Sequence, residues 1–514
     1  MHICLIRPST VLRRLSITVK PSAPLGLAFI AAALKREGHR ITIVDAIAEN
    51  PEQFTVIKGD IELNGLTNDE VAARIPNDVD AIGIHIMFTN NWLNDRALID
   101  CIGNKFKGIP IFAGGEHITG MPQRCLQQTK HLKVCVLGEG EETVVELMTS
   151  IHSDEQLQQI EGICYKTNEG KIRMNPRRAR IREVGTVAWP AWELFPLQKY
   201  REHELSYGVI KNELSLPIMA TRGCPYECTF CSSPQMWGTR YFMRKPEDVV
   251  DEIEHFQKLY GATNYDFYDL TAIVNRNWII EFCKELIARN IKITWQIPAG
   301  TRSEAIDEEV ANYLYRTGCR NITYAPESGS LDVLKAIKKK VRLPKMLESF
   351  RYTQKAGMSI KLNMLIGLPE ETHKSIWQTM WFLLQASKAG VHDIFPTVVV
   401  PYAGCELFMK LEREGKINPD SEEYFERIIV SDSFFGGYFY NDNISPLALR
   451  LYRLLYLFIF YTSNFVFHPT RLIGSISNLA KGTPVSRGEQ RLYEVIKRNT
   501  KVEAKSKVST FTEA

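Results

Sequence analysis

Three cysteines close together are the part of this sequence best suited to chemistry. Cys224, Cys228 and Cys231 have the spacing C-x₃-C-x₂-C, and no fourth cysteine lies nearby. Structural zinc sites and electron-transfer iron–sulfur sites normally use four protein ligands. Three thiolates leave one position open, and the open iron of an iron–sulfur cluster can bind a substrate. The alternative is an ordinary zinc or structural site.

The residues around the cysteines add a family resemblance. Arg222 and Gly223 precede the first cysteine, and Phe230 precedes the third. This segment resembles the cysteine motif of radical S-adenosylmethionine (radical SAM) enzymes. The resemblance implies a [4Fe–4S] cluster whose unique iron binds the amino and carboxylate groups of AdoMet. One electron then cleaves AdoMet to a 5′-deoxyadenosyl radical.

Four further segments resemble AdoMet-binding parts of the same family. An aromatic residue between the last two cysteines is implied to pack near the adenine, and an arginine after the third strand to reach the AdoMet carboxylate. The sequence Pro-Glu-Ser-Gly-Ser at 326–330 is implied to approach the ribose and the methionine part. Ile-Gly-Leu-Pro-Glu at 366–370 is implied to lay backbone against the adenine. The implied AdoMet contacts are Phe230, Arg302, Glu327, Ser328, Gly367 and Glu370. Core filling for the aromatic residue and a plain surface position for the arginine are the alternatives.

The composition is that of an ordinary globular protein. Of 514 residues, 45% are hydrophobic and 24% are charged, which is typical of several folded domains. A net charge of +4 is small for this length and argues against nucleic-acid binding. The other eight of the eleven cysteines are scattered and are interpreted as buried thiols in a reducing cytoplasm. The longest apolar run, residues 454–467, is shorter than the roughly 18 residues that a membrane span needs.

The first part of the chain alternates short β-branched strands with helical stretches. Strands are expected at residues 2–7, 40–45, 81–87, 110–113 and 133–137. An Ala-rich helix is expected at 25–38, and the first residues are typical of a strand rather than a signal peptide. This alternation predicts a doubly wound, Rossmann-like α/β domain over residues 1–151, with ligands at the carboxyl ends of the strands.

Two of these strand ends are rich in glycine. Gly-Gly-Glu-His at 114–117 follows the fourth strand, and Gly-Glu-Gly-Glu at 138–141 follows the fifth. Neither is a G-x-G-x-x-G fingerprint, so a nicotinamide-binding domain is not expected. Together with the helix that follows Pro24, they resemble the cobalamin-binding domain of one large radical SAM subgroup. The resemblance implies cobalamin contacts at Gly114, Gly115, His117, Gly138 and Gly140.

One motif of other cobalamin enzymes is missing. The D-x-H-x-x-G sequence, whose histidine ligates cobalt, is absent after the first strand. We therefore expect His117 near the corrin edge or the nucleotide rather than on cobalt, and cobalt without a protein imidazole. His85 is an alternative neighbour of the corrin, or a core histidine. For the whole domain, the alternative is a flavodoxin-like fold that no longer binds a cofactor.

A second series of strands begins near residue 211. Strands are expected at 216–221, 263–269, 291–297, 321–325, 359–367 and 393–400. Helices between them predict a partial (β/α)₆ barrel over residues 211–430, with its active site at the carboxyl ends of the strands. The cysteine loop follows the first strand of this series, at that face, which favours a catalytic cluster.

The remaining segments connect and extend these two domains. Residues 152–210 are interpreted as a linker with a small hairpin near 162–175, and residues 499–514 as a disordered tail. Residues 431–498 are expected to form a helical C-terminal region in which aromatic and basic residues gather. The helix at 448–461 suits a membrane surface, the wall of an apolar substrate cavity, or plain core packing.

These features together predict a cobalamin-dependent radical SAM enzyme of the cytoplasm, with the option of peripheral contact at the inner membrane face. As the resemblance implies, the 5′-deoxyadenosyl radical removes hydrogen from an unactivated carbon, and the carbon radical takes a methyl group from methylcobalamin. The expected partners are a hydrophobic substrate (a lipid, a hopanoid-like compound or a tetrapyrrole) and an electron donor such as flavodoxin or ferredoxin. Radical cyclisation or oxidation without methyl transfer, as in anaerobic tetrapyrrole cyclases, is the alternative. A non-catalytic cobalamin or iron sensor is a third reading.

Overall fold

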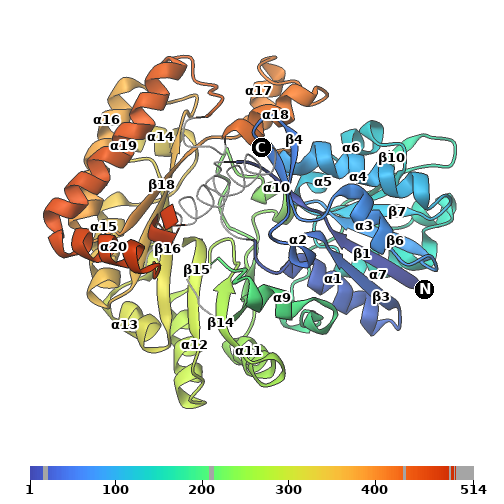
Figure 1. Ribbon diagram of the computed structural model, residues 1–514, viewed down its shortest axis with the longest axis horizontal. Helices are drawn as coiled ribbons and strands as arrows, with labels where there is room; N and C mark the ends of the chain where they lie inside the picture. The colour runs from blue at the N-terminus through green and yellow to red at the C-terminus, as the bar shows by residue number, and fades with distance from the viewer. Residues whose placement is uncertain are drawn as a thin grey trace, which may run out of the picture.

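Two helix-covered sheets, one mixed and one parallel, stand side by side and share one hydrophobic core (Figure 1). The computed structural model describes residues 1–14, 21–207, 213–301, 303–431, 436–484, 488–490 and 492–493. Arg302 and the predicted tail at 499–514 lie outside the described residues. The predicted combination of a doubly wound sheet, a six-stranded partial barrel and C-terminal helices is confirmed.

The N-terminal sheet has the strand order β10-β9-β8-β7-β6-β1-β3. Its five parallel strands are β1 (His2–Arg7), β3 (Arg40–Asp45), β6 (Ala81–His85), β7 (Ile111–Gly114) and β8 (Leu132–Val136). Because β1 pairs with β3 on one side and β6 on the other, the order of the strands reverses there. A crevice at the carboxyl ends of β1 and β6 follows from this reversal.

Helices cover both faces of this sheet and bring its glycine-rich ends into place. They are α1 (Leu25–Arg36), α2 (Ala46–Glu49), α3 (Asn68–Arg74), α4 (Trp92–Lys105), α5 (Glu116–Gly120), α6 (Pro122–Gln128), α7 (Glu141–Ser150) and α8 (Asp154–Leu157). The predicted Ala-rich helix is α1, and most of its side chains are buried. Small side chains let the helix lie close to the sheet, so the loop before it reaches the crevice.

Two β structures depart from the sequence-based expectation. The hairpin β9 (Ile163–Lys166) and β10 (Ile172–Met174) forms where it was predicted, but β9 pairs with β8. It therefore extends the sheet and is not part of a free linker. A small antiparallel sheet of β2 (Thr10–Arg13), β5 (Ile61–Asn64) and β4 (Phe54–Lys58) was not predicted. Its strands are short and lack a long alternating pattern, so their partners are visible only in three dimensions.

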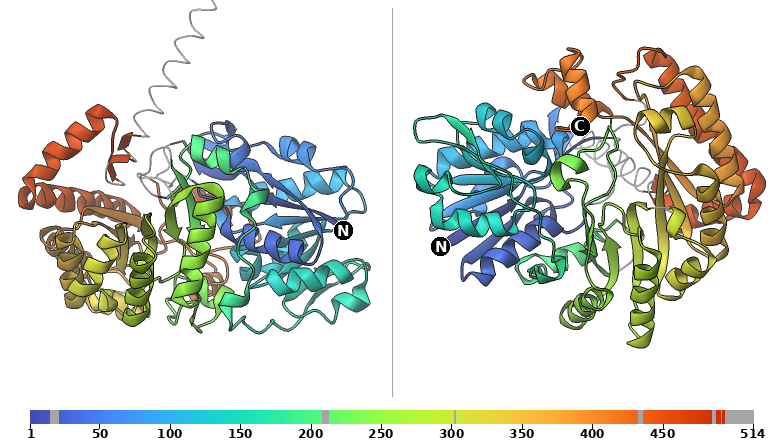
Figure 2. Two further views of the ribbon diagram at one scale, coloured as in Figure 1. Left: turned by 90° about the horizontal axis from the view of Figure 1, so that it is seen from below. Right: turned by 180° about the vertical axis from the view of Figure 1, so that it is seen from behind.

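The second sheet has the order β11-β14-β15-β16-β17-β18, and all its strands are parallel. Its strands are β11 (Leu214–Ile218), β14 (Ala262–Phe267), β15 (Thr294–Thr301), β16 (Cys319–Glu327), β17 (Ser359–Ile366) and β18 (Asp393–Val398). The flanking helices are α11 (Pro246–Tyr260), α12 (Arg276–Ala288), α13 (Glu308–Arg316), α14 (Leu331–Ala336), α15 (Leu343–Lys355) and α16 (His373–Lys388). Figure 2 shows these helices wrapped around the outside of the curved sheet. The predicted partial barrel is thus present, with boundaries shifted by a few residues.

The C-terminal part first returns to the N-terminal domain and then covers the barrel. Helices α17 (Glu406–Arg413) and α18 (Glu422–Ser431) lie beside the N-terminal sheet, where α18 contacts β2 and α4. Helix α19 (Pro446–Phe467) then packs along α16, and α20 (Pro469–Lys481) follows it. Within the described residues, no helix combines the length and the apolar run needed to cross a bilayer.

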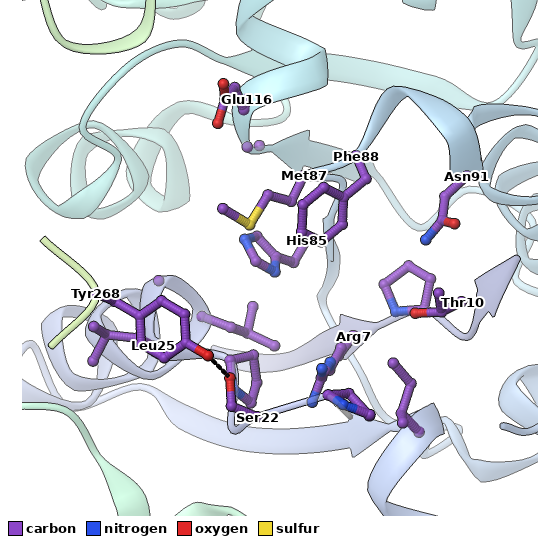
Figure 3. A pocket seen from close by; sticks show the side chains of 18 of the residues that line it. Arg7, Thr10, Ser22, Leu25, His85, Met87, Phe88, Asn91, Glu116 and Tyr268 are labelled. Atoms are coloured by element: carbon purple, nitrogen blue, oxygen red, sulfur yellow. Dashed lines mark hydrogen bonds between the residues drawn. The ribbon is translucent and has the colours of Figure 1, made fainter. Parts of the chain in front are cut away.

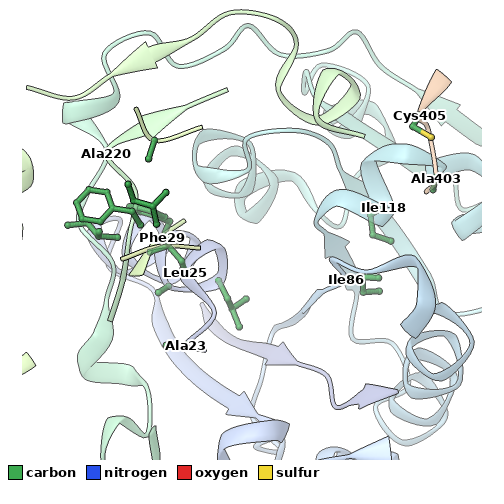
Figure 4. Close-up of a cluster of buried hydrophobic side chains, with 14 of the residues drawn as sticks. Ala23, Leu25, Phe29, Ile86, Ile118, Ala220, Ala403 and Cys405 are labelled. Carbon is green, nitrogen blue, oxygen red and sulfur yellow. The ribbon is translucent and has the colours of Figure 1, made fainter. Parts of the chain in front are cut away.

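The hydrophobic core continues from one domain into the other. Figure 4 shows Phe29 and Leu25 of α1 beside Ala220 of the barrel, and Ile118 of α5 near Ala403. A side chain at position 120 would meet this contact, because a Cβ on Gly120 would lie 2.5 Å from the Ala403 carbonyl oxygen. The two domains therefore meet in a close-packed interface, and not through a linker alone.

Candidate functional site

The cysteine loop lies at the carboxyl end of the first barrel strand, as predicted. It runs between β12 (Thr221–Arg222), which pairs with β13 (Phe242–Met243), and the short helix α10 (Ser233–Trp237). Cys224, Cys228 and Cys231 are each partly exposed. The backbone of the loop is fixed, because the Thr229 amide donates to the Ile337 carbonyl at 3.2 Å and the Leu407 amide donates to the Thr229 carbonyl at 2.8 Å. The loop that carries the three thiols is therefore held in place by backbone hydrogen bonds.

The thiols suit a cluster by their chemistry and position. Burial raises the pKa of Cys228, and it raises the pKa of Cys231 to about 12. Without metal these groups are thiols, whereas a bound iron deprotonates its ligand outright. Within the described residues, no three His, Cys, Asp or Glu side chains are close enough to share one ion. A four-iron cluster does not need such a group, because each thiolate binds its own iron. The role of these cysteines as cluster ligands stays a prediction.

The cysteine loop is also joined directly to the N-terminal domain. Arg222, which is buried, donates from Nη1 to Glu139 at 3.1 Å and from Nη2 to Glu141 at 2.6 Å. Ser232, just after the third cysteine, donates to Glu116. These three carboxylates stand in the two glycine-rich segments that were predicted to contact cobalamin. Hydrogen bonds therefore connect the predicted cluster site directly to the predicted cobalamin site.

Glu327 lies close to the cysteines, together with a lysine that the sequence did not single out. Glu327 ends β16 with φ of 66°, and its Oε1 lies 2.9 Å from Lys339 Nζ. Both side chains are largely buried. Burial alone would lower the pKa of Lys339, but the neighbouring Glu327 carboxylate outweighs it, and the pKa is raised. A cation is thus held beside a carboxylate and the cysteine loop.

The other predicted AdoMet residues have mixed surroundings. The Ser328 hydroxyl shares a hydrogen bond with Thr379 at 3.2 Å, and it accepts one from the Ser330 amide. The backbone at Gly367 has φ of +85°, which favours glycine, and a Cβ there would lie 2.6 Å from Phe439. Phe230 packs partly buried against the core, and Arg302 is not among the described residues.

The two adjacent glutamates after β17 differ sharply. Glu370 points to the surface, where it lies 3.2 Å from Lys410. Glu371 is buried and accepts from the amides of Gly367 at 2.6 Å and Leu368 at 3.0 Å. Burial raises the pKa of Glu371 to about 8. The structure thus gives Glu371, rather than Glu370, the task of shaping the turn that was predicted to meet the adenine.

A cavity of about 880 Å³ lies between the N-terminal sheet and the barrel. Its walls come from the carboxyl ends of β1 and β6, from both glycine-rich segments, and from barrel residues that include Thr221, Gly223 and Tyr268. Figure 3 shows the Tyr268 hydroxyl beside Ser22, at 2.7 Å, so the two domains touch across the cavity. The volume lies in the range of ligand and cofactor pockets.

Four of the five predicted cobalamin residues line this cavity. They are Gly114, Gly115, Gly138 and Gly140. At Gly115, φ is +123° and a Cβ would lie 2.3 Å from the Ile86 carbonyl oxygen, so only glycine lets these two backbones meet. A Cβ added to Gly114 or Gly138 would lie no closer than 3.5 Å to another atom, so the backbone of both residues is open to the cavity. This glycine-lined wall fits a large flat ligand.

His117 does not lie on the cavity wall. Its ring is buried beside Trp92, with ring centroids 4.9 Å apart, and Nδ1 lies 3.2 Å from the Thr89 hydroxyl. Burial lowers the pKa of His117 to about 3, so the imidazole is neutral. His85, by contrast, lines the cavity, and burial with the nearby Arg7 lowers its pKa to about 4. Of the two histidines considered from the sequence, the structure brings His85 to the predicted corrin space (Figure 3).

Several residues of this site carry no signal in the sequence. Lys339 stands in a run of three lysines at 338–340, and nothing in the run marks the middle one as buried. Asp269, at the end of the second barrel strand, is buried and accepts hydrogen bonds from Thr221 and the Ala220 amide. Burial raises the pKa of Asp269 to about 6. In the sequence, Glu139 and Glu141 stand out only as neighbours of glycines, and nothing there marks them as partners of Arg222. Pairing across domains is a property of the fold alone.

Comparison with known proteins identifies both halves of the molecule. Residues 218–383 match the radical SAM superfamily, and residues 19–148 match the B12 binding domain. Fold and site thus define a radical SAM enzyme with a second, cofactor-binding domain. The chain belongs to the B12-binding radical SAM enzymes, whose cofactors are a [4Fe–4S] cluster, AdoMet and cobalamin. The sensor reading is set aside by this membership.

Curated relatives share most of the chain. It is 29% identical over 412 residues to an uncharacterized methyltransferase of Pyrococcus horikoshii, covering 79% of this chain and 82% of the relative. It is 27% identical over 485 residues to cytidylyl-2-hydroxyethylphosphonate methyltransferase of Streptomyces wedmorensis, covering 88% and 89%. It is also 29% identical over 362 residues to anaerobic magnesium-protoporphyrin IX monomethyl ester cyclase of Cereibacter sphaeroides, covering 69% and 55%.

Solved structures have the same fold. The radical SAM methyltransferase TsrM from Kitasatospora setae superimposes with a TM-score of 0.60 at 18% identity, covering 80% of this chain and 76% of TsrM. The cobalamin-dependent radical enzyme OxsB also gives 0.60 at 18% identity, covering 83% of this chain and 56% of OxsB. At this identity the likeness supports the arrangement of the two domains and not the substrate.

Proposed function

We propose that the protein transfers a methyl group to an unactivated carbon of an apolar substrate. The observation that carries this proposal is the cavity between the two domains, whose wall includes Met87, Phe88, Leu270 and Val400. When bound, the cluster with AdoMet would supply a radical initiator and cobalamin would supply the methyl group. The apolar wall would exclude water and receive a lipid, hopanoid-like or tetrapyrrole substrate.

The chain's own residues would bind and orient these groups. Cys224, Cys228 and Cys231 would hold the cluster at the barrel side of the interface. On the other side of the interface, the backbone of the two glycine-rich segments, including Gly140, would hold cobalamin. AdoMet would lie at the carboxyl ends of the barrel strands, against Phe230, Glu327, Ser328 and Gly367. The two proposed cofactor sites would meet at Arg222, whose hydrogen bonds to Glu139 and Glu141 support a fixed relative position.

The proposed substrate class rests on the residues of the cavity wall and not on the substrates of the relatives. The Streptomyces wedmorensis relative is named for a polar, phosphorus-containing substrate, and the cyclase is named for a tetrapyrrole. Because these names differ in polarity, they do not select one substrate class for this chain. Aromatic and aliphatic side chains on the cavity wall favour an apolar one.

A second candidate function is radical cyclisation or oxidation without methyl transfer. The observation in its favour is the similarity to the Cereibacter sphaeroides cyclase, which equals in identity the similarity to the Pyrococcus horikoshii methyltransferase. The two functions differ in their AdoMet products. Methyl transfer yields S-adenosylhomocysteine, whereas cyclisation or oxidation yields 5′-deoxyadenosine alone.

The test uses the full chain, reconstituted without oxygen with iron, sulfide, cobalamin and AdoMet carrying a deuterated methyl group. Dithionite replaces the electron donor, for which we propose flavodoxin or ferredoxin. Extracts of a strain that lacks the gene, separated into lipid and pigment fractions, serve as substrate. We expect a product heavier by one deuterated methyl group, together with 5′-deoxyadenosine and S-adenosylhomocysteine. A product without the label would favour cyclisation, and a labelled product only from the aqueous fraction would reject an apolar substrate.

We also propose a cytoplasmic location. All eleven cysteines lie in the described part of the chain, and none of them forms a disulfide. Free thiols in such number are typical of a reducing compartment. Fractionation of cells and detection of the tagged full chain with cytoplasmic markers checks this proposal, and recovery with secreted proteins would contradict it.

A further inference from the structure

One outer face of the barrel presents apolar side chains to solvent. Helices α16 and α19 run side by side there, since His373 Nδ1 lies 2.8 Å from the Tyr452 hydroxyl and His468 Nε2 lies 3.1 Å from the Ser387 carbonyl oxygen. The two contacts join the starts and the ends of the paired segments, so the helices are parallel. With α20 they form the left edge of the molecule in Figure 1. We name this the outer helical face.

On α16, two tryptophans stand between two lysines. Trp377 is 56% exposed and Trp381 is 62% exposed. Residues four apart lie on one side of a helix, and Lys374 and Lys388 extend the same stripe at its two ends, both exposed. Tryptophan is a residue that prefers the boundary between water and lipid, and lysine prefers the adjoining headgroups.

Helix α19 continues the apolar surface. Its exposed stripe has helical spacing and consists of Leu447, Leu451, Leu454 and Phe458. The opposite side of the same helix is buried against the barrel through Leu449, Tyr456 and Phe460. A helix that is apolar on both sides is covered on both sides in most proteins. The outward stripe of α19 therefore lacks a cover within the described residues.

Helix α20 turns its polar side inward and its apolar side outward. Ser475 and Asn478 donate to the carboxylate of Glu489, at 2.5 Å and 3.1 Å, on the side toward the molecule. The opposite side carries Ile473, which is 72% exposed, and Ile476, which is 61% exposed. None of the α20 residues is buried, and Figure 2 (left) shows the helix standing away from the barrel. This orientation is the reverse of that of a helix packed on a core.

The charge of the outer helical face favours one kind of partner. Helices α16, α19 and α20 contain no Asp or Glu, although the chain has 59 of them in 514 residues. The exposed cations on these helices are Lys374, Lys388, Arg450 and Lys481. Apolar side chains on helices whose own acidic and basic residues are all cations suit a surface with an apolar interior and a negative boundary. An anionic lipid bilayer has both properties.

We propose that the outer helical face docks on an anionic lipid bilayer, with the aromatic and aliphatic side chains at the level of the headgroup boundary. The surface is separate from the cavity between the domains, so the proposal goes beyond the reaction and does not depend on it. It would bring the protein to the phase in which an apolar substrate is dissolved. The helices would lie on the membrane and not cross it.

The test is sedimentation of the full chain with vesicles of phosphatidylglycerol and phosphatidylcholine, compared with phosphatidylcholine alone. We expect binding to the anionic vesicles that weakens with added salt. The double substitution Trp377→Glu with Trp381→Glu should weaken partitioning by about tenfold or more, because two interfacial rings become carboxylates that the lipid repels. Leu259→Glu is the matched control, since Leu259 is 58% exposed on α11 away from this face, and it should bind as the parent does.

A second measurement reports contact directly. Vesicles with brominated lipid tails should quench the tryptophan fluorescence of the parent protein. Trp377→Phe with Trp381→Phe should keep the binding and lose most of the quenching, which a mere loss of folding would not produce. Absence of sedimentation with anionic vesicles, or equal binding by the double Glu variant, would overturn the proposal. A dimer in light scattering that the Glu variant dissociates would instead assign the face to a second copy of the chain and also overturn it.

Discussion

At the scale of single residues, the site depends on a few side chains with unlike surroundings. Three partly exposed thiols stand on a loop, while the buried pair Lys339 and Glu327 lies beside them. The thiols are the residues that the sequence predicts most sharply. The lysine is one that only the structure reveals, and the two kinds of residue lead to different predictions.

Replacing Cys228 by Ser should remove the cluster. A serine hydroxyl is a poor ligand for iron compared with a thiolate, so we expect loss of the brown absorbance and of most bound iron. AdoMet cleavage should fall to background, as measured by 5′-deoxyadenosine formation. The control is Cys101→Ser, because Cys101 is the other partly exposed cysteine and lies far along the chain on α4. Full iron content in the Cys228 variant would contradict the assignment.

Replacing Lys339 by Gln should weaken AdoMet binding about tenfold, since it leaves the buried Glu327 carboxylate without its partner. It should also lower the reduction potential of the cluster, because removing a nearby cation disfavours the added electron. Equilibrium dialysis and a redox titration followed by electron paramagnetic resonance measure the two effects. The neighbouring Lys338 pairs with Glu406 at an exposed position, so Lys338→Gln is a matched control and should change neither. Equal effects of both substitutions would argue for a general charge effect.

At the scale of elements, the turn after β17 is held by a buried acid. Glu371 accepts two backbone hydrogen bonds at Gly367 and Leu368, and α16 begins just beyond it. Those hydrogen bonds favour the charged form, but burial outweighs them and raises the pKa to about 8. The shift favours the protonated carboxyl in the folded protein around neutral pH.

This raised pKa predicts a pH dependence of stability. In the unfolded chain, Glu371 has its ordinary pKa of about 4.5, so it loses its proton above that pH while the folded chain keeps it. The contribution of Glu371 is thus full below about pH 4.5 and is lost as the pH rises through about 8. Glu371→Gln keeps the shape and removes the titration, so its melting temperature relative to the parent should rise steadily from pH 5 to about 8 and then level off. A constant difference between the two melting curves would refute the shifted pKa.

At the scale of the whole molecule, the two domains are joined by buried polar contacts and by a continuous core. Arg222 crosses from the barrel to Glu139 and Glu141, and its guanidinium lies 5.1 Å from the centre of the Phe29 ring. The cysteine loop begins at the next residue. We therefore expect the relative placement of the two proposed cofactor sites to depend on this contact.

Replacing Arg222 by Gln should loosen the joint between the domains. Buried Glu141 loses its cation, whereas Glu139 keeps Arg180 at 2.5 Å. Leaving one buried carboxylate unpaired costs about 3 kcal/mol or more. We expect a lower melting temperature, faster proteolysis between the domains and a larger radius of gyration in solution scattering. Arg289 pairs with acids at the surface, so Arg289→Gln should have little effect. Unchanged scattering and proteolysis in the Arg222 variant would show that the apolar core alone holds the domains.

The sequence by itself determined the chemistry and the two kinds of domain. Cysteine spacing, glycine-rich strand ends and alternating strands and helices are local patterns, and each keeps its meaning whatever lies around it in space. Only the tertiary structure decided which residues meet. It placed His85 rather than His117 at the cavity, and it turned Glu371 inward and Glu370 outward. It also set Lys339 beside Glu327, and within the described residues it left the apolar sides of α16, α19 and α20 exposed. Burial, pairing between distant segments and the direction of a side chain depend on long-range packing, which no local pattern specifies.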